Sequence, residues 1–217
     1  FELMIQGSKI CGVSDPETLN YILNHNHPPK FVGFISNYKK SKRYVTYENI
    51  KKLTKLKKTG INFVSVLVNP DDSILEKIKN INFDYYQLYD VDPARTKYIK
   101  DKYNKKIISA LTISNEEDIN KYTSYHNISD IILFDGKGYE KSISFDHNLL
   151  NSISTDLTIM IAGNINIDNI PIIKNLNYFV DVSGSLENEK GKKDLKKINN
   201  FLNIMHNYEI NKKNSIN

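Results

Sequence analysis

Eight short runs of apolar, β-branched and aromatic residues recur along this chain, and helix-like segments separate them. The runs cover residues 8–11, 31–35, 63–68, 84–88, 107–111, 131–134, 159–162 and 178–182. They are apolar almost throughout and do not alternate with polar residues, which is typical of parallel strands buried beneath helices. This repeated pattern limits the fold to an α/β architecture with a parallel sheet.

The segments between the runs have the spacing and start signals of helices. Ser14, Thr46 and Asp71 stand where helix N-caps are expected. The expected helices cover residues 15–24, 46–57, 72–79, 93–103, 116–122, 168–176 and 193–207, with a short element at 146–152. Eight such units in 217 residues match a (β/α)8 TIM barrel better than an open doubly wound sheet. We therefore predict one single-domain, eight-stranded parallel barrel over residues 1–217, with a polar tail from about residue 208.

Composition and charge restrict the classes of molecule that this protein is expected to bind. Hydrophobic residues make up 40% of the chain and charged residues 25%, and no apolar run is long enough to cross a bilayer. The net charge is +5, but the lysines are spread over helix-like faces and no nucleic-acid-binding motif accompanies them. The first residues lack the basic region of a secretory signal, and a single cysteine fits a reducing compartment. We expect a cytoplasmic protein with a small anionic substrate, and neither nucleic acid nor membrane as a partner.

A barrel of this class carries its function at the carboxyl ends of the strands. The residues at these positions are Cys11, the segment 36–43, Tyr89 with Asp90, Asp135, Gly163 with Asn164, and Ser183-Gly184-Ser185. Cys11 is the only cysteine, so an internal disulfide is excluded. It is either a small buried hydrophobe or a reactive group, and its place at a strand end favours chemistry.

Several short motifs stand at or near these positions. Lys-Ile-Cys-Gly stands at residues 9–12, and Gly-Phe followed by Ser-x-Arg-Tyr-Val at 33–34 and 41–45. They are followed by Gln87-Leu88, Asp135, Phe145-Asp146, Ala162-Gly163, Asn166, Asn169, Asp181-Val182-Ser183, Glu187, Gly191, Lys193 and Asp194. Taken together and in order, these motifs resemble the phosphoribosylanthranilate isomerase family of tryptophan biosynthesis, from residue 9 to about residue 200.

The resemblance implies an Amadori rearrangement that needs no metal and no organic cofactor. N-(5-phosphoribosyl)anthranilate would become 1-(2-carboxyphenylamino)-1-deoxyribulose 5-phosphate, with Cys11 as general base and Asp135 as general acid. A free thiol is only about 3% thiolate at pH 7, and a free aspartate is protonated in about one molecule in a thousand. Both side chains therefore need environments that shift their pKa values.

Substrate contacts follow from the same positions. Arg43 suits the anthranilate carboxylate because a guanidinium group matches a carboxylate in bidentate geometry, although an ion pair within the protein is the alternative. Gly163 and Asn164, with Ser183, Gly184 and Ser185, lie where barrels of this class bind phosphate, or else form ordinary tight turns. Family members occur as monomers or homodimers, and the sequence favours neither.

The chain departs from the family pattern mainly in loops. The glycine-rich stretch after the sixth strand reads Tyr139, Glu140, Lys141 and Ser142, and the usual His-Gly after the fourth strand is Tyr89-Asp90. Lost glycines matter where the backbone needs a positive φ or approaches a ligand closely. A related sugar-phosphate isomerase and a catalytically silent barrel that serves as an interaction partner therefore stay open as alternatives.

Overall fold

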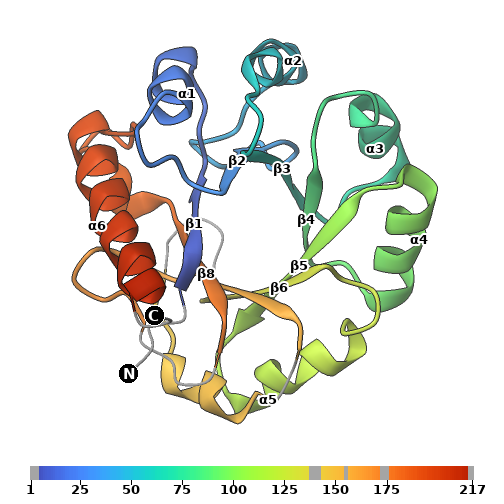
Figure 1. Cartoon of the computed structure of the whole chain (residues 1–217). Helices are drawn as coiled ribbons and strands as arrows, with labels where there is room; N and C mark the ends of the chain where they lie inside the picture. The colour runs from blue at the N-terminus through green and yellow to red at the C-terminus, as the bar shows by residue number, and fades with distance from the viewer. Residues whose placement is uncertain (1–4, 137–142, 154–155, 172–175, 215–217) are drawn as a thin grey trace.

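The strands close into a barrel, as predicted. The computed structural model describes residues 5–136, 143–153, 156–171 and 176–214, and side chains as far as Tyr208. All neighbouring strands are parallel, and β8 pairs with β1 to close the ring in the order β1 to β8. Figure 1 shows the helices arranged around the outside of this ring. The strands are β1 Ile5–Cys11, β2 Phe31–Ile35, β3 Asn62–Val68, β4 Tyr85–Tyr89, β5 Lys106–Ile113, β6 Ile131–Gly136, β7 Thr158–Ile161 and β8 Tyr178–Val182.

The helical elements differ more from the expectation than the strands do. The α-helices are α1 Pro16–Leu23, α2 Tyr47–Leu53, α3 Asp72–Ile78, α4 Pro93–Tyr103, α5 Glu116–Asn120 and α6 Leu195–Asn214. The 3-10 helices are η1 Thr54–Leu56, η2 Lys121–Ser124, η3 His147–Ser152 and η4 Gly184–Leu186. The chain from residue 208, expected as a polar tail, continues α6 to Asn214.

Side-chain caps fix several helix starts, and one of the expected caps is wrong. The side chains of Thr46 and Asp71 accept hydrogen bonds from backbone N–H groups three residues later, as predicted. The first helix is capped by Asp15 and not by Ser14, because Asp15 Oδ1 accepts from the N–H of Thr18 at 2.8 Å. Pro16 explains the difference, since proline favours the first helical position and keeps the preceding residue extended.

The helix expected over residues 168–176 is not formed in its described part, 168–171 and 176. Asparagine side chains instead bond to the backbone of this loop: Asn166 Oδ1 accepts from the N–H of Asp168 at 2.8 Å, and Asn169 Oδ1 accepts from the N–H of Asn166 at 2.7 Å. Such local bonds compete with helical hydrogen bonds. Residues 172–175 lie outside the described residues.

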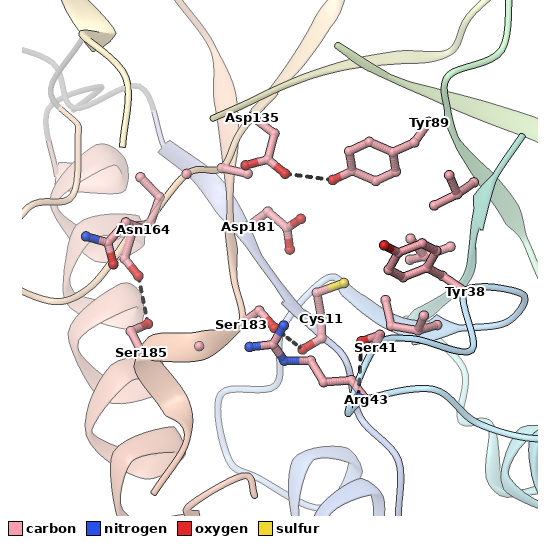
Figure 2. A pocket seen from close by; sticks show the side chains of 17 residues that line it. Cys11, Tyr38, Ser41, Arg43, Tyr89, Asp135, Asn164, Asp181, Ser183 and Ser185 are labelled. Atoms are coloured by element: carbon pink, nitrogen blue, oxygen red, sulfur yellow. Dashed lines mark hydrogen bonds between the residues drawn. The ribbon is translucent and has the colours of Figure 1, made fainter. Parts of the chain in front are cut away.

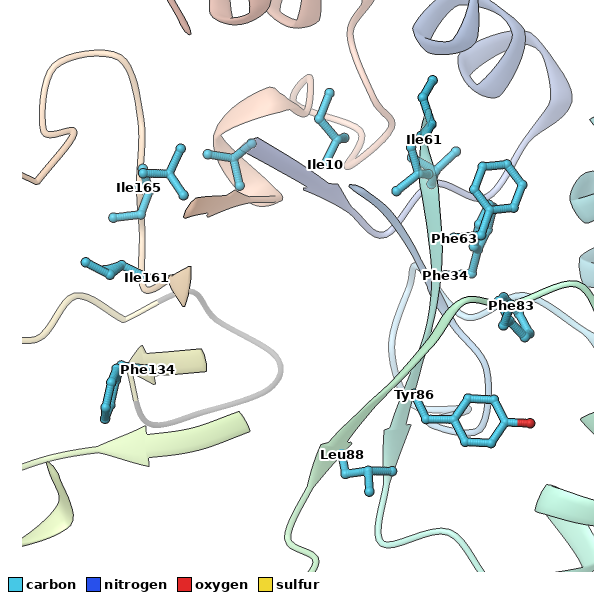
Figure 3. Close-up of a cluster of buried hydrophobic side chains, with 14 of the residues drawn as sticks. Ile10, Phe34, Ile61, Phe63, Phe83, Tyr86, Leu88, Phe134, Ile161 and Ile165 are labelled. Carbon is cyan, nitrogen blue, oxygen red and sulfur yellow. The ribbon is translucent and has the colours of Figure 1, made fainter. Parts of the chain in front are cut away.

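Two apolar clusters follow from the alternation of side chains along each strand. Outward-facing residues such as Ile10, Phe34, Phe63 and Phe134 pack beneath the helices, and Figure 3 shows part of this cluster. The second cluster fills the barrel interior and contains Cys11, Phe31, Val64, Val66, Tyr85, Tyr89, Ile108, Ala110, Ile131, Leu133, Met160 and Ala162. The barrel interior is thus packed. The last inward-facing residue of each strand forms the floor of any cavity at the carboxyl end of the barrel.

Candidate active site

A cavity lies at the carboxyl ends of the strands and brings together all eight residues that the sequence singled out. The space between its walls, with the open mouth included, is about 790 Å³. Its lining includes Cys11, Arg43, Asp135, Gly163, Asn164, Ser183, Gly184 and Ser185. Figure 2 shows the side chains of Cys11 and Asp135 from two different strands facing this one space. The arrangement can hold one substrate between a thiol and a carboxyl group.

Asp135 occupies the last inward-facing position of β6 and has a strongly shifted acidity. Burial raises the pKa of its carboxyl group to about 7, against the lowering effect of a hydrogen bond from Tyr89. The Tyr89 hydroxyl donates this bond to Asp135 Oδ2 at 2.8 Å. Burial and the nearby charge of Asp135 raise the pKa of Tyr89 well above its ordinary value, so Tyr89 stays a neutral donor. A carboxyl group titrating near neutral pH can both give and take a proton.

Cys11 closes β1 and is 8% exposed at the floor of the cavity. Burial raises the pKa of its thiol above the ordinary value, and the positive charges of Lys9 and Lys193 partly oppose this effect. The thiolate is therefore a minor form of the unliganded protein at neutral pH. The backbone carbonyl oxygen of Cys11 accepts a hydrogen bond from Ser183 Oγ at 3.0 Å, which connects the end of β1 to the loop after β8.

Arg43 lines the cavity and is also held by a buried carboxylate. Its Nε and Nη2 donate to the two carboxylate oxygens of Glu187, the second bond at 3.1 Å. Lys193 Nζ and the exposed Lys42 Nζ also contact this carboxylate, at 3.1 and 3.0 Å. Burial acts to raise the pKa of Glu187, but the bond from Arg43 and the charge of Lys193 lower it to about 2. Three cations around one carboxylate leave an excess of positive charge beside the cavity.

The loops after β7 and β8 meet on the other side of the cavity. Gly163 and Asn164 both have positive φ angles, 92° and 54°. The Asn164 carbonyl accepts from Asn169 Nδ2 at 2.8 Å, and Ser185 Oγ donates to the Ile165 carbonyl at 2.7 Å. The first bond lies within the loop after β7, and the second joins that loop to the loop after β8. Together they restrain the backbone at a position where barrels of this class bind phosphate. Residues 139–142, where the family pattern is lost, lie outside the described residues.

Sequence reasoning gave no role to several residues that the fold brings to the cavity. Asp181 lines it from β8, Tyr38 from the loop after β2, and Tyr89 contacts the carboxyl group of Asp135. The inward-facing position of Asp181 two residues before Ser183 could have identified it, because side chains alternate along a strand. The loop residue Tyr38 carries no comparable signal.

Among the described residues, no group of three or more His, Cys, Asp or Glu side chains is placed to hold a metal ion. None of the helices in the described ranges is both long and apolar enough to span a bilayer.

Comparison with known proteins decides the family. A family model described as N-(5'phosphoribosyl)anthranilate (PRA) isomerase matches residues 8–204. The chain belongs to the PRA isomerase family. This confirms the prediction from the motifs, and with it the prediction of an isomerase of tryptophan biosynthesis built on a TIM barrel.

PRA isomerases from several sources resemble the chain over most of its length. An N-(5'-phosphoribosyl)anthranilate isomerase from Brucella canis is 32% identical over 204 residues, covering 89% of this chain and 90% of that protein. The solved phosphoribosyl anthranilate isomerase of Thermotoga maritima is 26% identical, with a TM-score of 0.81, and covers 94% of this chain and 100% of that one. A further PRA isomerase, in complex with reduced 1-(o-carboxyphenylamino)-1-deoxyribulose 5-phosphate, is 25% identical over the same shares, with a TM-score of 0.76.

Proposed function

We propose that this chain converts N-(5-phosphoribosyl)anthranilate into 1-(2-carboxyphenylamino)-1-deoxyribulose 5-phosphate, with Asp135 as general acid and Cys11 as general base. The observation that carries the proposal is that the thiol and the carboxyl group face one cavity from two strands, β1 and β6, with β7 and β8 between them in the ring. A PRA isomerase of the same fold holds a reduced form of this product, which supports the choice of substrate.

The reaction uses the two groups in sequence. Asp135 in its protonated form gives a proton to the ring oxygen of the ribose, and the ring opens to an iminium ion. The Cys11 thiolate then removes the proton from C2, which gives an enolamine that tautomerises to the ketone. The pKa of about 7 supports Asp135 in the acid role, because an appreciable share of its carboxyl group is protonated at neutral pH.

The rest of the cavity binds the two anionic ends of the substrate. Arg43 takes the anthranilate carboxylate: Glu187 engages its Nε and one Nη2 proton, so Nη1 and the other Nη2 proton are left for the substrate. The phosphate binds at Gly163, Asn164, Ser183, Gly184 and Ser185, where two joined loops line the cavity. A free thiol base needs a reducing compartment, so we place the reaction in the cytoplasm. Monomer and homodimer are both compatible with a cavity built from one barrel.

A fluorescence assay tests the proposal. Anthranilate and phosphoribosyl pyrophosphate, with a phosphoribosyltransferase, generate the unstable substrate, and the loss of its fluorescence is followed after this protein is added. We expect rapid loss with the wild-type protein and an equal rate with Asp101→Asn, which alters an exposed carboxylate of α4. No acceleration over spontaneous decay would refute the proposed activity.

Arg43→Lys separates this reaction from that of a related sugar-phosphate isomerase. Lysine keeps the charge but loses the planar fork, so KM for the anthranilate-bearing substrate should rise by about tenfold or more. A KM equal to that of the wild type would place the carboxylate elsewhere and favour a substrate without the anthranilate ring.

A further inference from the structure

A buried ion pair lies beside Cys11 in the barrel interior. We propose that Lys9, held in place by Asp181, sets how much of Cys11 exists as thiolate and is a positioning residue for proton abstraction. This inference rests on the proposed function, because it assigns a partner to the base of that reaction.

The alternation of side chains along β1 brings Lys9 and Cys11 to the same face of the sheet. They are two residues apart in β1, so both side chains point into the barrel. Lys9 lies opposite Asp181 in β8, and Cys11 lies opposite Gly33 in β2. The position next to Cys11 on β2 therefore has no side chain of its own.

The Lys9 side chain borders the space that Gly33 leaves. A Cβ atom at residue 33 would lie 3.0 Å from Cys11 Sγ, 3.1 Å from Lys9 Cε and 3.3 Å from Lys9 Nζ. The sulfur and the ammonium group thus border one space about the size of a methyl group. Gly33 allows Lys9 to reach the level of Cys11.

Asp181 keeps the ammonium group charged and in position. Lys9 is 0% exposed, and its Nζ lies 2.9 Å from Asp181 Oδ2. Burial acts to lower the pKa of Lys9, but the negative charge of Asp181 and the nearby thiolate form of Cys11 raise it overall. A buried lysine without such partners would tend to lose its proton. Asp181 Oδ1 is buried and has no hydrogen-bond partner in the described part of the chain, so the carboxylate is bound only on its Lys9 side.

The charged groups around the sulfur act in opposite directions. Lys9 of β1 and Lys193, which follows β8, stabilise the thiolate, whereas the charge of Asp181 opposes it. Tyr89 of β4 and Asp135 of β6 face the same cavity. Removing Lys9 should therefore raise the pKa of the Cys11 thiol, because the repulsion from Asp181 is left uncompensated. Removing the charge of Asp181 should raise this pKa by less, because Lys9 then tends to lose its proton while the repulsion from Asp181 also disappears. A pair that only stabilises the barrel would leave the pKa of the thiol unchanged.

Alkylation of Cys11 by iodoacetamide, measured from pH 6 to 10 on the full chain without substrate, tests the proposal. Only thiolate reacts, and the chain has no other cysteine. We expect Lys9→Met to slow alkylation at pH 7 by about tenfold and to shift its pH profile upward. Asp181→Asn should slow alkylation by less than Lys9→Met does, and Gly33→Ala should slow it because the added methyl group displaces Lys9. Lys57→Met is the matched control, since it removes a Lys–Asp pair with Asp84 before β4, at the amino ends of the strands.

An upward shift of the alkylation profile for Lys9→Met, and a smaller upward shift for Asp181→Asn, support the proposal. A wild-type profile for Lys9→Met, or faster alkylation of Asp181→Asn, overturns it. If urea unfolding shows that Lys9→Met does not fold, slower alkylation of both Asp181→Asn and Gly33→Ala supports the proposal, and wild-type or faster rates overturn it. The alkylation profile needs no turnover. Failure of the proposed reaction in the fluorescence assay is therefore distinguishable from failure of this assignment.

Discussion

Glu187→Gln should destabilise the protein in a way that depends on pH. Glu187 is 6% exposed, and its carboxylate contacts Arg43, Lys42 and Lys193. These cations lower its pKa from an ordinary value of 4.5 to about 2. A shift of roughly 2.5 pH units corresponds to about 3 kcal/mol of stability at neutral pH, at 1.36 kcal/mol per unit.

The sign follows from the direction of the shift. The folded state lowers the pKa, so the stabilisation is complete above pH 4.5 and is lost as the pH falls through the window from about 4.5 to about 2. Glutamine resembles the protonated carboxyl group in shape and charge. The difference between wild type and variant should be about 3 kcal/mol at pH 7 and should approach zero near pH 2.

Urea unfolding at pH 7, 5, 4 and 3 measures this difference. Glu76→Gln is the control, because Glu76 on α3 also has a lowered pKa but is exposed to solvent, which screens its contacts. We expect a much smaller change for the control. A difference between wild type and Glu187→Gln that stays constant from pH 7 to pH 3 would contradict the reasoning.

Three further predictions concern the cavity. If Cys11 must be deprotonated and Asp135 protonated, kcat/KM should be level between pH 7 and the Cys11 pKa and fall about tenfold per unit on either side, since Asp135 titrates at about 7 and the Cys11 pKa lies above its ordinary value. A profile still level at pH 5.5 would exclude this pairing. Tyr89→Phe removes the hydrogen bond that lowers the pKa of Asp135, so the acid limb should move to higher pH, and an unmoved limb would show that the bond has no such effect. Gly163→Ala should lower the free energy of unfolding, measured in urea, by roughly 1–3 kcal/mol, because residue 163 has a φ of 92° and its new Cβ would lie 2.9 Å from the Ile143 carbonyl oxygen. An unchanged urea midpoint would mean that this loop relaxes freely.

The strands could be predicted from the sequence because their signal is local. The runs at 31–35 and 178–182 have the same bounds in the structure as in the prediction, and the others differ by three residues or fewer at each end. Apolar runs of β-branched residues identify buried strands without reference to the rest of the chain. Eight such runs alternating with helices favour a closed barrel over an open sheet, and a barrel carries its function at the carboxyl ends of the strands.

The helix expected at residues 168–176 and the ion pairs around the cavity show where the apolar pattern of the sequence was not enough for a prediction. Residues 168–171 were expected as a helix start, but asparagine side chains bond to the loop backbone there. The pairing of Arg43 with Glu187 joins residues 144 positions apart, and that of Lys9 with Asp181 joins residues 172 apart. Such contacts depend on barrel closure and on strand register, which no local pattern specifies.

The rates of Cys11→Ala and Asp135→Asn in the fluorescence assay test the central claim most directly. Each positioned proton transfer contributes roughly 10²–10⁴-fold, so each variant should lose at least about two orders of magnitude in kcat while its urea unfolding shows an intact fold. The double variant should be little worse than the poorer single variant, because both groups serve one turnover. If either single variant kept a tenth or more of the wild-type rate, the thiol and the carboxyl group would not be the base and the acid of this reaction.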